Sequence, residues 1–140
     1  MADELDLQRA VFATLNAALS IPLYTRRAPH QSTGQYLVLQ WIAITPDYDM
    51  EDETSGVTDA LIQIDAYGDS VDEAGQAARA AKNAMKQVRG SLGAAPNQVL
   101  VWGNDKTDQR DYTGQQGDLM DNRISQDYRI SWNEEEFTTP

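Results

Sequence analysis

Hydrophobic and polar residues alternate most regularly in the segment 57–67. One side of an extended chain would carry Ala60, Ile62, Ile64 and Ala66, and the other side Leu61, Gln63, Asp65 and Tyr67. This period of two is typical of a β-strand with one buried face. We therefore predict a central strand over 57–67.

A helix with a recognisable start follows this strand. Ser70 and Glu73 have the spacing of a capping box, in which the serine hydroxyl accepts a hydrogen bond from the glutamate amide. The apolar stripe that follows has helical spacing, consists mostly of alanine and extends to Val88. Gly90 is a natural residue to end this helix. An alanine-rich face lets a helix lie close against a sheet, so we interpret this strand and helix as a scaffold unit.

The rest of the chain supplies one more helix and several strands. Leucine or valine recurs every fourth residue near the N-terminus, at Leu7, Val11, Leu15 and Leu19, which predicts a helix over 3–19. Segments rich in β-forming residues predict further strands at 23–25, 36–44, 98–102 and 123–133.

Two segments are predicted as long loops. Residues 104–120 include four Asp, three Gln and two Gly without periodicity, which predicts a loop that orders on binding a partner. The other loop, 45–56, follows the strand that Pro46 closes. Together the elements predict a single α+β domain over 1–140, in which an antiparallel sheet of about four to five strands has two helices packed on one face.

The loop 45–56 lies in the most acidic part of the chain. The chain has 22 Asp and Glu against 11 Lys and Arg, a net charge of −11, which disfavours ordinary binding to nucleic-acid phosphates. The acids of this loop include Asp47, Asp49, Glu51, Asp52 and Glu53. A run of acids is usually a solvated loop that keeps a protein soluble. The alternative is an anionic lining or a patch that faces a partner.

Residues suited to known catalytic or metal sites are scarce. There is no cysteine and one histidine, His30, so neither a thiolate site nor a histidine cluster is possible. No phosphate-binding glycine loop or nucleophile elbow occurs, and the acidic loop lacks the central glycine and final glutamate of an EF-hand. Asp65 is the one carboxylate singled out, and we expect it on the outward side of its strand, near a helix or a partner arginine. We expect no enzyme activity, no cofactor and no metal.

Membrane and export signals are not evident either. The most apolar run, 36–44, is too short to span a bilayer, and no basic region precedes an apolar run at the N-terminus. We expect a soluble protein of the cell interior.

Several of these segments, taken in order, resemble the tail-completion family of tailed bacteriophages, which comprises tail-terminator and tail-to-head joining proteins. The matching segments are an alanine- and leucine-rich helix (11–19), a short strand with a proline-bearing stretch (23–29), an apolar strand opened by an aromatic residue (36–39), a strand before an alanine-rich helix (62–68 and 73–88) and a C-terminal strand (127–132). The resemblance covers roughly residues 7–133. The loop 104–120 departs from it, because family members are often shorter there.

The resemblance implies a structural protein of the virion neck that assembles in the host cytoplasm. In that role a homo-hexameric ring caps the tail tube and joins it to the head connector or stopper, and DNA passes through the lumen without specific binding. We place the candidate interface in the two loops, at the acids of 45–56 and at Arg110, Asp111 and Tyr112.

Two alternatives remain open from the sequence. One is another virion role, as a head-closure (stopper) protein or a minor tail protein. The other is an acidic DNA-mimic inhibitor that captures a basic nucleic-acid-binding enzyme.

Overall fold

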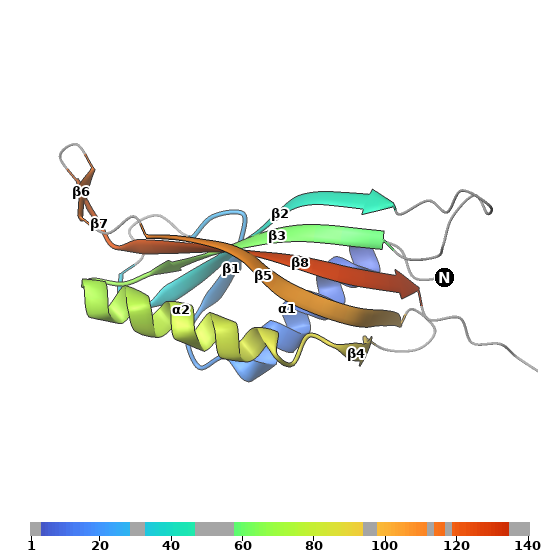
Figure 1. The fold of residues 1–140 in the computed structure, drawn as a ribbon. Helices are drawn as coiled ribbons and strands as arrows, with labels where there is room; N and C mark the ends of the chain where they lie inside the picture. Colours follow the sequence, from blue (N-terminus) through green and yellow to red (C-terminus); the bar gives the residue numbers. More distant parts are fainter. Residues whose placement is uncertain are drawn as a thin grey trace, which may run out of the picture.

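The computed structural model describes residues 4–28, 33–46, 58–93, 98–111, 114–116 and 119–134. In chain order its elements are α1 (Glu4–Ala18), β1 (Leu23–Thr25), β2 (Tyr36–Pro46), β3 (Thr58–Tyr67), α2 (Val71–Met85), β4 (Gly90–Leu92), β5 (Val99–Asp111), β6 (Gly114–Gln116), β7 (Leu119–Asp121) and β8 (Arg123–Glu134). The fold is a mixed α+β arrangement of two helices and a curled sheet (Figure 1).

Six strands form the main sheet, in the order β1-β2-β3-β8-β5-β4. The short β1 runs parallel to β2, and the other neighbouring strands are antiparallel. The strands β6 and β7 pair only with each other and extend beyond one end of β5 and β8 (Figure 1). Figure 1 also shows both helices on the same side of the sheet, which leaves the opposite face without helical cover.

The core lies between the helices and the sheet. The alternation in β3 is confirmed, because Ala60, Ile62, Ile64 and Ala66 are all buried. Five alanines of α2 are buried as well, so this helix lies close to the centre of the sheet. The helix α1 contributes Leu7, Val11 and Leu15. Burying each large apolar side chain contributes about 1.5–3 kcal/mol to the free energy of folding. This layer is therefore the main source of stability.

The capped start of α2 is confirmed. The Ser70 hydroxyl accepts a hydrogen bond from the amide of Glu73 at 3.2 Å, and Asp72 and Glu73 lie where the helix dipole favours acids. The predicted end is wrong, because the helix stops at Met85 with Lys86 as its C-cap. Gly90 instead opens β4 with a φ of 75°, a conformation that glycine adopts without strain.

Two other predictions about the sheet are wrong. The sheet has six strands, where four to five were expected, because no residue pattern indicated the three-residue β4. The predicted loop 104–120 is also wrong, both over 114–116 and 119–120, which belong to β6 and β7, and over 104–111. There β5 continues and pairs with β8 as far as Asp111 opposite Ile124. Shifts of register between Val101 and Gly103, and again between Lys106 and Asp108, break the alternation by which a strand is recognised.

Candidate functional site

Of the predicted interface residues, the structure describes two. Arg110 and Asp111 lie near the end of β5. The other six predicted positions lie outside the described residues, namely Asp47, Asp49, Glu51, Asp52, Glu53 and Tyr112. The candidate site therefore comprises Arg110 and the residues around it, on the sheet face that carries no helix.

Arg110 joins β5 to β8 through a forked ion pair. One guanidinium nitrogen donates to Asp127 Oδ2 at 3.1 Å and the other donates to Oδ1 at 3.0 Å. The first nitrogen also donates to Asp108 at 2.9 Å. Two carboxylates therefore surround one guanidinium, and the cluster keeps a net negative charge. Such bidentate pairs are stronger and more directional than simple surface ion pairs.

A chain of hydrogen bonds continues from Arg110 into the sheet. Arg110 donates to Gln63 Oε1 at 3.3 Å, and the Gln63 amide donates to Asp65 at 2.9 Å. The Ser125 hydroxyl donates to the same Asp65 oxygen at 2.5 Å. The prediction for Asp65 was right about its side of the strand, which its pairing with Ser125 on β8 fixes. Asp65 is nevertheless buried, and the hydrogen bonds described for it come from Gln63 and Ser125, not from an arginine.

This chain of side chains connects three strands across the open face. Asp65 and Ser125 are 2% and 1% exposed, so neither offers a surface to a substrate. Within the described residues no three aspartate, glutamate or histidine side chains come together as metal ligands. The arrangement therefore acts as a polar clamp that links β3, β5 and β8, since hydrogen bonds in a connected network strengthen one another in a low dielectric.

A second polar cluster lies on the helix side of β8. Gln126 is 2% exposed and donates to the Ala78 carbonyl of α2 at 3.2 Å and to Gln109 at 3.3 Å. Its Oε1 accepts a hydrogen bond from the Tyr128 hydroxyl at 2.8 Å. Burial raises the pKa of Tyr128 to about 12. Gln126 was not among the predicted site residues. Its position midway between the inward-facing Ile124 and Tyr128 nevertheless predicts a buried polar side chain.

Three tyrosines gather on β1, β2 and β3. Tyr36 and Tyr67 face each other as direct partners in the register, and their rings stack with centroids 4.7 Å apart. Tyr24 approaches Tyr36 edge-on at 6.1 Å. Aromatic pairs of this kind add about 0.5–1.5 kcal/mol beyond simple burial. Because the three rings pack against one another, we interpret them as structural residues that stabilise the pairing of these strands.

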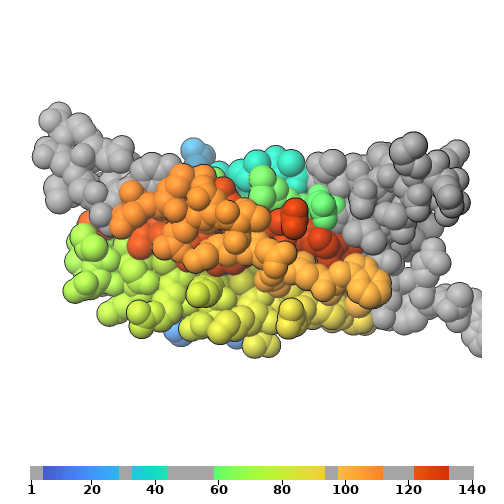
Figure 2. Space-filling model, viewed as in Figure 1, coloured from blue at the N-terminus to red at the C-terminus, as the bar shows by residue number. Residues whose placement is uncertain are grey.

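The two sides of the sheet end in strands that are only partly covered. Register pairs link β1 to β2 only at Leu37, Val38 and Leu39, and link β4 to β5 only at Val99, Leu100 and Val101. Among the described residues, 40–46 of β2 and 103–111 of β5 therefore have a strand on one side only. In Figure 2 the orange atoms of β5 lie at the front above α2, and no other coloured segment covers them.

Each of these edges carries a large exposed apolar side chain at a bulge. Ile42 is skipped in the pairing of β2 with β3, where Trp41 and Ala43 are paired instead, and its side chain is 50% exposed. Trp102 is skipped in the same way in the pairing of β5 with β8, and it is 62% exposed. An extra residue in a strand redirects its side chain. At both edges this redirection leaves an apolar group in water.

A groove of about 970 Å³ adjoins the edge of β2, between that strand, β1 and the first half of α1. Its apolar wall includes Leu5, Phe12 and Trp41, and two arginines, Arg9 and Arg26, also line it. None of the ion pairs formed among the described residues involves either arginine. In a chain of net charge −11, this is a local positive site with an apolar wall.

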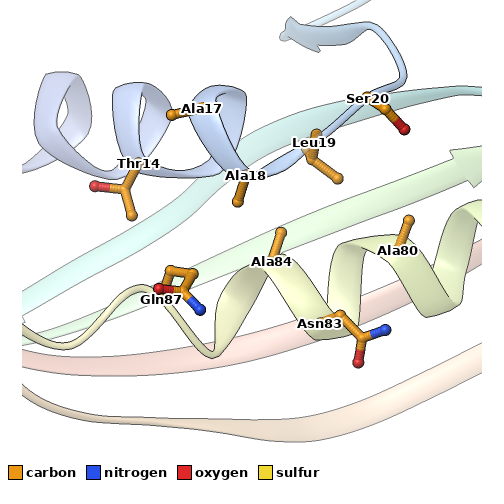
Figure 3. Close-up of a pocket in the computed structure, with 9 residues that line it drawn as sticks. All are labelled: Thr14, Ala17, Ala18, Leu19, Ser20, Ala80, Asn83, Ala84 and Gln87. Carbon is orange, nitrogen blue, oxygen red and sulfur yellow. The ribbon is translucent and has the colours of Figure 1, made fainter.

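A second groove of about 710 Å³ separates the C-terminal halves of the two helices. Figure 3 shows Ala18 of α1 and Ala84 of α2 pointing toward each other across it, while Asn83 points away. Short side chains leave this space unfilled. Thr14, at its rim, already donates to the Ala10 carbonyl at 2.8 Å. The groove is lined by small apolar side chains together with the polar residues Ser20 and Gln87 and, among the described residues, by no charged one.

Comparisons with known proteins leave the family open. No protein-family model matches the chain, and no curated protein matches it. One solved structure, whose name describes no function, aligns with 97% of this chain and 99% of its own at 12% identity and a TM-score of 0.47. Neither described helix has the length and apolar character needed to cross a membrane.

Proposed function

We propose that this chain is a structural subunit of a bacteriophage neck, in which copies of it form a ring that caps the tail tube and joins it to the head connector. The sequence resemblance to the tail-completion family suggests this role. The structural observation that supports it best is the pair of partly uncovered strand edges, 40–46 of β2 and 103–111 of β5, at opposite sides of one sheet.

Edges at opposite sides of a subunit suit ring formation. An exposed edge can pair with another strand by main-chain hydrogen bonds. When the two contacting surfaces differ, each added copy presents a fresh surface to the next, and the assembly closes into a ring if the rotation between copies allows it. A contact confined to one edge would stop at a dimer. The two edges of this chain provide the unlike surfaces that a ring requires.

The charge of the chain supports the same role. DNA that passes through a neck must not be held by the walls, and a net charge of −11 repels phosphates. The acids on β5 add to that field at one edge, where Asp105, Asp108 and Asp111 are all exposed. An anionic ring fits DNA passage better than DNA capture.

The test of this proposal is electron microscopy of particles made by a parent phage with the gene deleted. Over-long tails are expected if the protein ends tail growth, and normal tails beside unjoined full heads if it joins the two parts. Intact virions would refute a role in the neck. The same images separate the stopper and minor-tail alternatives, because each gives a different defect.

Complementation of the deletion connects the defect to the sheet edge. Ile42→Lys places a charge on the edge of β2, whereas Val71→Lys places one at the start of α2, where Val71 is 55% exposed. We expect Val71→Lys to restore virions and Ile42→Lys to fail. Equal restoration by both variants would exclude the edge of β2 from assembly.

A further inference from the structure

We propose that the groove beside β2 receives Trp102 and the neighbouring acidic edge of β5 from a second copy of this chain. The inference rests on the proposed ring and names the surfaces that would form it. The groove has room for an indole, since its volume is about 970 Å³. Trp102 is the most exposed of the large apolar side chains described.

The walls of the groove match the chemistry of an indole. Phe12 and Trp41 supply aromatic and apolar surface, and Leu5, which is 49% exposed, stands at the same groove. Tryptophan is one of the residues enriched among interface anchors, which lie in well-packed pockets that exclude water. Arg9 and Arg26 add guanidinium groups, which favour the face of an indole ring.

The charges of the two surfaces are complementary. Arg9 and Arg26 form no ion pair with the described residues, whereas β5 beyond Trp102 carries three aspartates, Asp105, Asp108 and Asp111, against the two cations Lys106 and Arg110. Within its own subunit Asp105 forms a long ion pair with Arg129, at 3.8 Å, and both side chains are well exposed. A second copy therefore brings a net negative charge to a groove that two arginines line. Complementary charges of this kind orient partners and speed their encounter.

The backbone at Arg26 points to the same place. Arg26 is the one non-glycine residue with a positive φ, 70°, in the described part of the chain. Its amide donates to the Leu39 carbonyl at 3.0 Å, and its own carbonyl accepts from the Gln40 side chain at 3.4 Å. Such conformations are uncommon for residues other than glycine and gather at binding sites. Here this conformation sets Arg26 at the groove, next to the edge of β2.

The proposed contact joins two different surfaces, because the groove and Trp102 lie at opposite sides of the sheet. The groove lies at the β1 and β2 side, and Trp102 lies on β5, three strand positions from β2 in the order of the sheet. One copy can therefore use its groove and its Trp102 at the same time, with two different neighbours. This is the arrangement that a closed ring needs.

Sedimentation velocity of the purified full-length chain over a dilution series tests the contact. Trp102→Ser removes the anchor, and the double change Arg9→Glu with Arg26→Glu reverses the charge of the groove. Val71→Ser is the control, because Val71 is of similar exposure but belongs to neither surface. Circular dichroism of each variant verifies that it folds.

We expect the wild type and Val71→Ser to associate, and the other two variants to lose affinity by about 30-fold or more, as for an anchor residue. An equimolar mixture of Trp102→Ser and the double variant is expected to give dimers, because one intact groove then meets one intact Trp102. Neither variant alone should do so.

Three results would overturn the inference. The first is that either surface variant associates as tightly as the wild type. The second is a mixture of the two variants that forms no dimer, and the third is a wild-type chain that stays monomeric at every concentration. None of them decides the proposed function, because tail morphology in the gene-deleted phage tests that separately. Intact virions without the gene would refute the neck role even if the contact between copies were real.

Discussion

Gly68, at the junction of β3 and α2, is a position where one added methyl group should have a large effect. A Cβ there would lie 2.4 Å from the Ala74 nitrogen and 2.6 Å from the Glu73 Cβ. The Glu73 carbonyl carbon would be 2.7 Å away. Real Cβ atoms do not approach other atoms so closely. Two of these three atoms belong to the backbone of the first helical turn, so a side-chain rotation cannot relieve the overlap.

The surroundings of Gly68 allow little movement. The first turn of α2 is held by Ser70, whose carbonyl accepts from the Ala74 amide at 3.0 Å. On the strand side, the Gly68 amide donates to the Asn122 carbonyl at 3.3 Å. Ala74 is fully buried in the core. We therefore expect Gly68→Ala to lower the free energy of unfolding by about 1–3 kcal/mol, the usual cost of overpacking.

Gly75 provides the matched control, because the same chemical change should have the opposite sign. It lies within α2 and a Cβ there would meet nothing within 4 Å. Alanine is favoured over glycine inside a helix by about 0.8–1 kcal/mol, so Gly75→Ala should raise the free energy of unfolding. Urea denaturation followed by tryptophan fluorescence measures both. Unchanged stability in Gly68→Ala, or a loss in Gly75→Ala, would refute this account of the junction.

Three further predictions concern the polar clusters of the sheet. Gln126→Ala should lower the free energy of unfolding by about 2 kcal/mol or more, measured by urea denaturation, because it leaves buried partners without hydrogen bonds. A double-mutant cycle of Arg110→Met and Asp127→Asn should give a coupling free energy of about 0.5–1 kcal/mol, and this energy should shrink with added salt because the pair is partly exposed. Additive effects of the two changes would mean that this ion pair does not stabilise the fold. Burial raises the pKa of Tyr128 from its ordinary value of 10.0 to about 12 in the folded chain. The contribution of its neutral form to stability is therefore fully present below pH 10 and is lost as the pH rises through 12. Tyr128→Phe should remove that part of the fall in the urea midpoint, and an unchanged fall would contradict it.

The parts of the fold that the sequence predicted are those in contact with the core. In β3 and α2, burial on one side imposes a period of two or a helical stripe, and both patterns are visible without coordinates. In α1 the same is true of Leu7, Val11 and Leu15, which are fully buried. Helix ends were less predictable. Gly90 is a plausible stop, yet α2 ends at Met85, a turn and two irregular residues follow, and Gly90 opens β4.

The second half of β5 was hidden for a physical reason. Val99 and Val101 face the core, but beyond Gly103 the strand lies at an edge and is polar on both sides. Its hydrogen bonds to β8 hold it in place, and these require no particular side chain. The bulges at Trp102 and Thr107 then shift the phase of the residues that do alternate. No window of the sequence could show a strand there.

The candidate site was partly predictable for the same reason. Arg110 was named as an interface residue, yet its partners Gln63 and Asp127 depend on the register of three strands, which the sequence did not supply. The groove arginines come from α1 and from the residue after β1, and only folding brings them beside Trp41. Sites assembled from separate elements need the topology before they can be recognised.

The clamp and the edges belong to one mechanical argument. A subunit that pairs by its sheet edges must hold those edges at a fixed angle, because a small error repeats at every copy around a ring. The chain from Arg110 through Gln63 and Asp65 to Ser125 links β5, β3 and β8, and α2 packs on the other face of β3 and β8. Stiffness is thus concentrated at the centre of the sheet, between the two surfaces proposed to meet. A variant that loosens the clamp without unfolding the chain, such as Gln63→Ala, should therefore broaden the distribution of oligomers seen by native mass spectrometry, whereas an edge variant should shift it to monomer. A narrow distribution with Gln63→Ala would mean that ring geometry does not depend on this network.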